Sequence, residues 1–237
     1  MAVSRGPWVR LGRRVAALAG ALKPYGQAAR LFNTAALALA LATGVAAAGQ
    51  QTLRLVVFGD SLTAGYGLPA AAAFPAQLER ALTARGLDVV VVNAGVSGDT
   101  TAGGLARLDW TLAEGPDALI LALGANDALR GIDPQLTYDN LDRILSRLGE
   151  RGVMVLLAGM LAPPNLGRAY GDRFDAIFPR LAEEHGVPLY PFFLDGVAAE
   201  PALNLGDGLH PNEAGVAVMV ARITPYVLRL IDRLRRR

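Results

Sequence analysis

Five short apolar runs, separated by longer amphipathic stretches, set the strongest constraint on how this chain can fold. The runs are rich in Val, Leu and Ile, and they lack the alternation of apolar and polar residues that marks a strand with one exposed face. They occupy residues 53–58, 89–92, 118–123, 153–158 and 187–190. Strands of this kind are typical of a parallel sheet whose two faces are both covered by helices.

The stretches between the apolar runs carry the periodicity of amphipathic helices. In residues 134–152, four apolar side chains fall on one helical face, and a glycine ends the pattern. Residues 74–86 and 172–186 repeat this scheme, and a last helix extends from near Pro211 towards Leu234. The regular alternation of strand and helix predicts a three-layer α/β fold with a doubly wound, mainly five-stranded parallel sheet.

The first 48 residues differ in composition from the rest of the chain. They contain six basic residues and no acidic residue, and an uncharged run of 15 residues from Thr34 ends in three alanines at Ala48, a pattern suited to signal peptidase. This run is shorter than the roughly 20 residues of a membrane span. We therefore expect residues 1–48 to be a signal peptide or N-terminal targeting segment and residues 49–237 to form a single domain. The mature chain would then be periplasmic or secreted, without a stable membrane span; a retained N-terminal anchor is the alternative.

Charge and residue counts exclude several classes of protein. Without the first 48 residues the chain has 17 basic and 21 acidic residues, so we expect no nucleic-acid partner. The absence of cysteine excludes disulfides and thiolate metal sites. With only two histidines, far apart, we expect no metal and no cofactor. The sequence also lacks a G-x-S-x-G elbow, a dinucleotide-binding glycine loop and a P-loop lysine motif.

Polar residues follow the predicted strands at the sheet edge where doubly wound folds bind ligands. Ser61 follows the first strand, Gly98 the second and Asn126 the third, while Asp207 and His210 come after the last. Each residue also has an ordinary structural interpretation. Ser61 and Asn126 are typical helix caps, Asp207 is typical of a turn between glycines, and His210 is typical of an extended residue before a proline.

Taken together, these segments resemble the GDSL or SGNH hydrolase family. They occur in the family's order and spacing over about residues 53–232, and they read "GDSLTAGYG", "NAGVSGDTTAGGLARL", "LALGANDALRG" and "DGLHPN". Their context is similar to the bacterial periplasmic thioesterase I group, whose members also act as lysophospholipases and arylesterases. The resemblance implies a flavodoxin-like SGNH hydrolase fold.

The resemblance also implies roles for the polar residues. Ser61 would be the nucleophile, Asp207 and His210 would complete a catalytic triad, and Ser61, Gly98 and Asn126 would donate to the oxyanion. These types of residue suit the chemistry, because a serine hydroxyl needs an adjacent base and a tetrahedral intermediate needs preorganised donors. The implied function is a monomeric serine hydrolase that cleaves small-molecule esters or thioesters of acyl chains. A catalytically weak lipid- or acyl-binding module on the same scaffold is the alternative.

Contacts with the substrate are predicted from apolar residues near these segments. The candidates are Leu129, Leu161, Pro163 and Tyr170, three of them in the loop 159–170 after the fourth strand. An ordinary surface loop with apolar contacts is the alternative. The pattern leaves open whether the head group is a thioester, a lysophospholipid or an aryl ester, and how long the acyl chain is.

Overall fold

The computed structural model describes residues 52–113 and 115–236, and these form a parallel α/β fold. The predicted targeting segment, its cleavage site at Ala48 and the predicted domain boundary lie outside the described residues. The sheet has five strands in the order β2-β1-β3-β4-β5, all pairs parallel. The strands are β1 (Leu53–Gly59), β2 (Val89–Gly95), β3 (Ala118–Ala122), β4 (Met154–Ala158) and β5 (Leu189–Tyr190). The predicted doubly wound, five-stranded sheet is confirmed.

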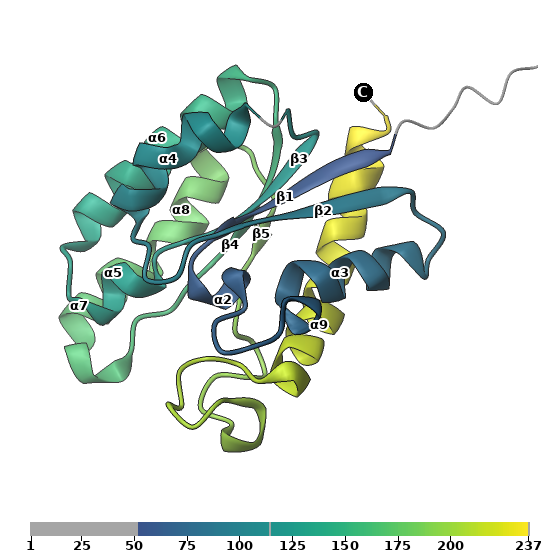
Figure 1. Cartoon of the computed structure of the whole chain (residues 1–237). Helices are drawn as coiled ribbons and strands as arrows, with labels where there is room; N and C mark the ends of the chain where they lie inside the picture. Colours follow the sequence, from purple (N-terminus) through teal and green to yellow (C-terminus); the bar gives the residue numbers. More distant parts are fainter. Residues whose placement is uncertain (1–51, 114, 237) are drawn as a thin grey trace, which may run out of the picture. The chain divides into compact units, whose positions relative to one another are not determined.

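Helices cover both faces of this sheet, so that the domain has three layers (Figure 1). Helices α4 (Thr101–Leu112), α6 (Pro134–Glu150) and α8 (Ile177–Glu184) lie on one face, and α3 (Phe74–Thr83) and α9 (Glu213–Leu234) lie on the other. The shorter helices are α2 (Ser61–Ala64), α5 (Ala125–Leu129), α7 (Arg168–Asp175), η1 (Ala70–Ala72), η2 (Pro164–Leu166) and η3 (Pro201–Leu203). Because helices cover both faces, every residue of the central strand β3 is buried, which explains its uninterrupted apolar sequence.

The helix predicted over residues 172–186 is wrong as a single element. The chain forms two helices there, α7 and α8, which are separated at Ala176. Pro179 explains the break, because it has no N–H to donate to the carbonyl of Asp175 and its ring would collide with that carbonyl in a continuous helix. The apolar periodicity of the segment is correct, but the proline divides it.

Two further boundaries differ from the prediction by a few residues. Strand β5 has only two residues, Leu189 and Tyr190, instead of the predicted run from residue 187. Helix α9 begins at Glu213 because the side chain of Asn212 accepts a hydrogen bond from the Gly215 N–H at 3.0 Å and so acts as the N-cap.

Helix α9 is long and apolar enough to cross a membrane if only length and composition are considered. In the fold, however, its apolar side packs against α3, β3 and β4. This burial is typical of the core helix of a globular domain.

Two glycines at the carboxyl edge of the sheet allow α2 to pack closely against it. Gly59 of β1 pairs in register with Gly95 of β2. A Cβ atom on Gly59 would lie 2.6 Å from the carbonyl oxygen of Ala122, and one on Gly95 would lie 2.4 Å from the nitrogen of Ala64. Since only glycine fits at both positions, the sequence permits α2 to begin directly at the strand end, which brings Ser61 to this edge.

Candidate active site

The turn between β1 and α2 places a serine at the edge of the sheet and buries the carboxylate that precedes it. Asp60 is the N-cap of α2, and its Oδ1 accepts from the Leu62 N–H at 3.0 Å. Ser61 is therefore the first residue of the helix and not its cap, so the cap interpretation of Ser61 is wrong. Its hydroxyl is left available for a partner from elsewhere in the chain.

That partner is His210, which comes from the loop before α9. Its Nε2 lies 2.9 Å from Ser61 Oγ, and its Nδ1 lies 2.7 Å from Asp207 Oδ2. The second oxygen of Asp207 accepts from the backbone N–H groups of Leu209 and His210. The structure therefore joins the three residues of the predicted triad in one hydrogen-bonded series. The other histidine, His185, ends α8 and bonds to a carboxylate of α6, so it takes no part in this series.

Hydrogen bonds keep the carboxyl group of Asp207 ionised. The N–H groups of His210 and Leu209, together with the imidazole, lower the pKa of Asp207 to about 2. At neutral pH this carboxylate is an acceptor only, so the imidazole must present its Nδ1 proton to it. The free electron pair of Nε2 then faces the Ser61 hydroxyl, as a general base requires.

Asp60 has the opposite electrostatic character. It is completely buried, and this burial raises its pKa to about 6, although the Leu62 N–H and His210 act in the other direction. A buried carboxylate beside Ser61 is costly, and no role was predicted for it from the sequence. Its Oδ2 accepts from Asn126 Nδ2 at 3.3 Å, which connects it to the helix α5 after the third strand.

Asn126 is the second residue of α5, the short helix that follows β3. The N-cap of this helix is Gly124, and the Asn126 side chain donates instead of accepting: its Nδ2 bonds to the Asp99 carbonyl at 2.9 Å, in addition to Asp60. A cap must accept from a backbone N–H. The alternative interpretation of Asn126 as a helix cap is therefore wrong.

Gly98 lies in the loop after β2 with φ of 81°, a conformation that favours glycine. Its carbonyl accepts from Nη2 of Arg130 at 2.7 Å, and the next carbonyl, that of Asp99, accepts from Asn126. Two bonds therefore hold this loop against the segment that contains α5. Among the described residues, no hydrogen bond uses the backbone N–H of Gly98 or of Ser61.

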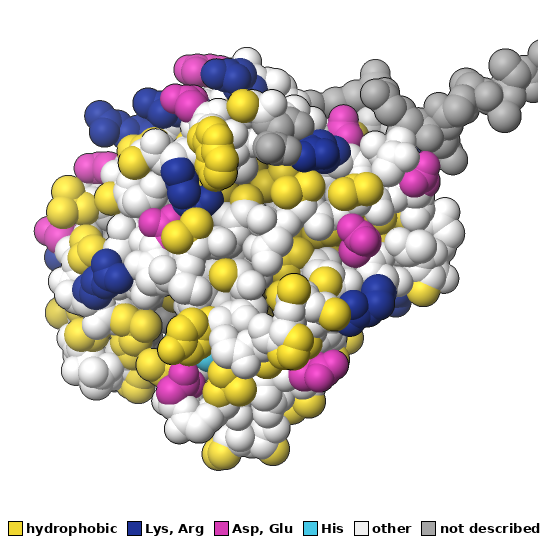
Figure 2. All heavy atoms as spheres, in the orientation of Figure 1, with side chains coloured by type: hydrophobic (Ala, Val, Ile, Leu, Met, Phe, Trp, Pro, Cys, Tyr) yellow, Lys and Arg dark blue, Asp and Glu magenta, His cyan; other side chains and the backbone are white. Residues whose placement is uncertain are grey.

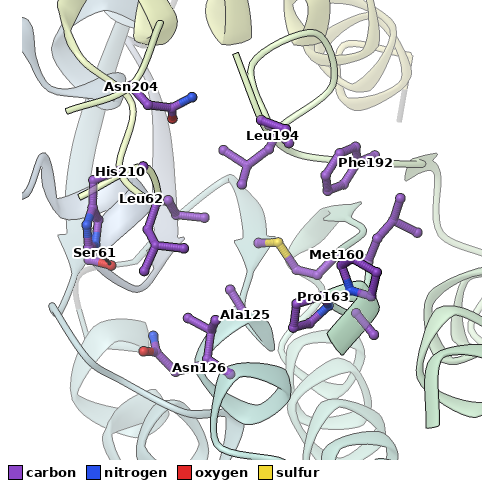
Figure 3. A pocket seen from close by; sticks show the side chains of 18 residues that line it. Ser61, Leu62, Ala125, Asn126, Met160, Pro163, Phe192, Leu194, Asn204 and His210 are labelled. Atoms are coloured by element: carbon purple, nitrogen blue, oxygen red, sulfur yellow. Dashed lines mark hydrogen bonds between the residues drawn. The ribbon is translucent and has the colours of Figure 1, made fainter. Parts of the chain in front are cut away.

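An apolar cavity of about 420 Å³ begins at Ser61 and His210, and neither Gly98 nor Asp207 is among the residues that line it. In Figure 3, Ser61 and His210 lie at one end, and Met160 and Phe192 lie at the other. The remaining lining residues are Leu62, Ala125, Asn126, Leu129, Leu161, Ala162, Pro163, Pro164, Leu194, Ala198, Ala199, Asn204, Gly208 and Leu209. Hydrophobic side chains also border a histidine that is visible on the surface in Figure 2. The site therefore combines a polar end with a largely apolar interior.

Three of the four predicted substrate contacts line this cavity, namely Leu129, Leu161 and Pro163. Tyr170 does not. Its ring stacks on Phe174 at a centroid distance of 6.0 Å, and its hydroxyl donates to the carbonyl of Ile132 at 2.8 Å. The prediction for Tyr170 is wrong because the residue belongs to α7, which packs against the helices on one face of the sheet.

Sequence reasoning missed several residues of the site. The ring of Tyr66 lies 4.4 Å from that of His210, centroid to centroid, and is half exposed. An aromatic residue between two glycines shortly after Ser61 was the available signal. Phe192 and Leu194 line the cavity on either side of the buried Phe193, and this alternation just beyond β5 was a second signal.

Comparison with known proteins identifies relatives over most of the chain. A model of the GDSL-like lipase/acylhydrolase family matches residues 57–218. The arylesterase of Vibrio mimicus is 44% identical over 177 residues, covering 74% of this chain and 88% of that protein. Esterase TesA of Pseudomonas aeruginosa is 40% identical over 202 residues, covering 85% and 98%. Thioesterase 1/protease 1/lysophospholipase L1 of Escherichia coli strain K12 is 43% identical over 159 residues, covering 67% and 75%.

Solved structures agree with this assignment. The crystal structure of TesA is similar with a TM-score of 0.72 at 38% identity, covering 75% of this chain and 99% of that chain. AlinE4, an SGNH-hydrolase family esterase, gives a TM-score of 0.65 at 44% identity, covering 76% and 96%. Since the family model spans more than half of the chain and its motifs converge at one sheet edge, this chain belongs to the GDSL-like lipase/acylhydrolase family.

Proposed function

We propose that this chain is a serine hydrolase that cleaves carboxylic esters and thioesters of acyl chains through an acyl-enzyme on Ser61. The observation that carries the proposal is the hydrogen-bonded series from Asp207 through His210 to Ser61, at one end of an apolar cavity. The names of the related proteins, an arylesterase, an esterase and a thioesterase/lysophospholipase, support this class of reaction.

In the proposed reaction, His210 Nε2 accepts the proton of the Ser61 hydroxyl as Oγ attacks the acyl carbonyl carbon. Asp207 stabilises the imidazolium that forms and keeps the ring in one orientation. His210 then returns the proton to the leaving alcohol or thiol as the bond to it breaks. A water molecule, deprotonated by the same imidazole, attacks the acyl-enzyme and releases the carboxylic acid.

The oxyanion of each tetrahedral intermediate would accept from Ser61 N–H, Gly98 N–H and the Asn126 amide. Both backbone groups are without a partner among the described residues, which supports this role. The Asn126 amide has two partners, and the longer bond, 3.3 Å to Asp60, is the one that we expect the oxyanion to replace. Donors already in place need no reorganisation as the charge develops.

The cavity supports an acyl chain as the group that enters the protein. Its interior is largely apolar, so burial of methylene groups there is favourable, by about 0.8 kcal/mol for each CH₂. Leu129, Leu161 and Pro163 are proposed to contact this chain. The partner is accordingly a small-molecule ester or thioester, and the protein acts as a monomer.

Covalent labelling tests the proposal against the acyl-binding alternative. A fluorophosphonate probe should add one adduct to the folded protein, detected by intact mass, and Ser61→Ala should abolish it. Ser146→Ala, at an exposed serine on α6, is the matched control and should label normally. A folded wild-type protein that takes no label would support a binding module. Rates with aryl esters, acyl thioesters and lysophospholipids of graded acyl length would then define the substrate.

We also propose that the chain is exported and cleaved after Ala48, giving a periplasmic or secreted protein without an anchor. The uncharged run that ends at Ala48 supports this. Intact mass of the exported protein tests it: a mature chain that begins at Gly49 is expected, whereas one that begins at Met1 would indicate a retained anchor. Light scattering on the same sample tests the monomer.

A further inference from the structure

Arg107 of α4 is bonded to three segments that meet at the site, although it does not line the cavity. Its Nε donates to Asp99 Oδ2 at 2.6 Å, its Nη1 to the Ala94 carbonyl at 2.8 Å and its Nη2 to the Gly59 carbonyl at 2.8 Å. Its guanidinium carbon lies 4.1 Å from the centre of the Phe58 ring. Because all three nitrogens are bonded and the group stacks on an aromatic ring, the guanidinium is held in one position.

Two of these partners, Gly59 and Asp99, lie close in sequence to a proposed oxyanion donor. Gly59, at the end of β1, is separated from Ser61 by a single residue. Asp99 directly follows Gly98, and its own carbonyl accepts from Asn126 Nδ2 at 2.9 Å. Arg107 therefore contacts the residue next to Gly98 and the residue two positions before Ser61, and it is linked to Asn126 through Asp99.

The start of α4 is shaped to allow this arrangement. A Cβ atom on Gly103 would lie 1.9 Å from Asp99 Oδ1, and one on Gly104 would lie 2.3 Å from a methyl carbon of Leu123. Glycine at these two positions lets the first turn of the helix approach Asp99 and Leu123 without displacing their side chains. Arg107 follows one turn later on the same helix and reaches the same carboxylate.

We propose that Arg107 is a positioning residue for the oxyanion site. It ties the carboxyl end of β1 to the loop 96–100, so that the N–H groups of Ser61 and Gly98 and the amide of Asn126 remain aimed at one point. This inference rests on the proposed function. Donors that stabilise a transition state act only when their geometry is held, so loosening this tie slows the chemical step more than it weakens substrate binding.

The test compares Arg107→Met, which keeps an unbranched apolar stem but removes the guanidinium and its donors, with Arg107→Lys. Steady-state kinetics on a short-chain p-nitrophenyl ester should show that kcat falls by about 10- to 100-fold in Arg107→Met while KM changes little. Arg107→Lys should lie between that variant and the wild type, because an ammonium cannot bond to all three partners at once.

Arg180→Met is the matched control. The Nε of Arg180 donates to Glu184 at 2.8 Å and its guanidinium carbon lies 4.2 Å from the centre of the Tyr138 ring, so it makes the same two kinds of contact away from the cavity. Its kcat should equal that of the wild type. A loss of kcat in Arg180→Met as large as that in Arg107→Met would overturn the proposal, since any stacked arginine would then have the same effect.

A second measurement separates positioning from general stability. An alkyl boronic acid forms a tetrahedral adduct on the serine and needs the oxyanion donors, so its affinity should fall in Arg107→Met in parallel with kcat/KM. Asp99→Asn, which weakens the same bond, should change both quantities in the same direction if Arg107→Met does not fold. Unchanged boronate affinity and kcat in the folded variant would refute the role of Arg107. A wild-type protein that neither hydrolyses esters nor binds the boronate would instead refute the proposed function.

Discussion

Substitution of Asn126 distinguishes a catalytic role of this residue from a purely structural one. Its amide donates to the Asp99 carbonyl and to Asp60, so it is oriented as a donor. We predict that Asn126→Ala lowers kcat by about 10²–10³-fold, because one oxyanion donor is lost. KM should change little, since the contact strengthens mainly in the transition state. Steady-state kinetics and thermal melts on the same samples measure both effects.

Asn126→Asp is the matched control for that experiment, because it preserves size and shape. It would place a second carboxylate beside Asp60 and opposite the developing oxyanion, so we expect a loss of kcat near neutral pH at least as large as for Asn126→Ala. Near-normal turnover of Asn126→Asp, with Asn126→Ala only melting earlier, would contradict the role as a donor.

Asp60 makes stability depend on pH in a direction opposite to that of most carboxylates. Its pKa is about 6 in the folded protein and 3.8 without burial, so folding opposes its ionisation. The cost is fully present above about pH 6, decreases as the pH falls towards 3.8, and has an upper value of about 3 kcal/mol. We predict that Asp60→Asn raises the free energy of unfolding, relative to the wild type, more at about pH 8 than at about pH 4.

The same substitution should lower kcat. The asparagine oxygen would accept from the Leu62 N–H as Asp60 does now, which leaves an NH₂ group facing the donor amide of Asn126. Two donors repel, so the amide would turn and lose its orientation. Denaturant unfolding at the two pH values and kinetics on the same variant check both expectations. A variant that is active and shows no pH-dependent gain would contradict them.

At the scale of elements, the loop between β5 and η3 contains one strained residue. Ala199 has φ of 62°, in the left-handed region that disfavours residues with a Cβ atom, and it lines the cavity. We predict that Ala199→Gly stabilises the fold by up to about 1 kcal/mol. Relief of the backbone strain should outweigh the opposing effect of the entropy that glycine adds to the unfolded chain. Thermal melts measure the change.

Ala198→Gly is the matched control for this loop. Ala198 also lines the cavity but lacks a positive φ, so glycine there should only add entropy to the unfolded chain and lower stability. If both substitutions change the melting temperature in the same direction, backbone strain at Ala199 is not the cause.

At the scale of the whole molecule, every residue assigned to the site lies between Gly59 and His210, and the first strand begins at Leu53. We therefore predict that a chain beginning at Gly49 has the same kcat/KM and the same melting temperature as the full chain of residues 1–237. Kinetics and calorimetry on the shortened chain measure this. A lower melting temperature would show that residues 1–48 contribute to the fold.

The sequence by itself determined the sheet and most of the polar site. Buried parallel strands are encoded by adjacent apolar residues, and the turns after them by glycines and polar residues next to those strands, so both can be predicted locally. This is why all five strands, and the grouping of Ser61, Asn126 and His210 at one edge, were predictable. The division at Ala176 was also encoded locally, by Pro179, but the apolar periodicity across it concealed the break.

Only the tertiary structure decided which side chains meet. Ser61 and His210 are 149 residues apart, and their 2.9 Å contact depends on strand order and on the path of the loop before α9. Tertiary structure also decides the ring contact between Tyr66 and His210 and the position of Tyr170 outside the cavity lining. It likewise decides the hydrogen bonds of Arg107 to the ends of two strands. Periodicity is a property of neighbours in sequence. These contacts instead arise from packing between elements that are far apart in the chain, and local patterns do not determine how such elements are arranged in space.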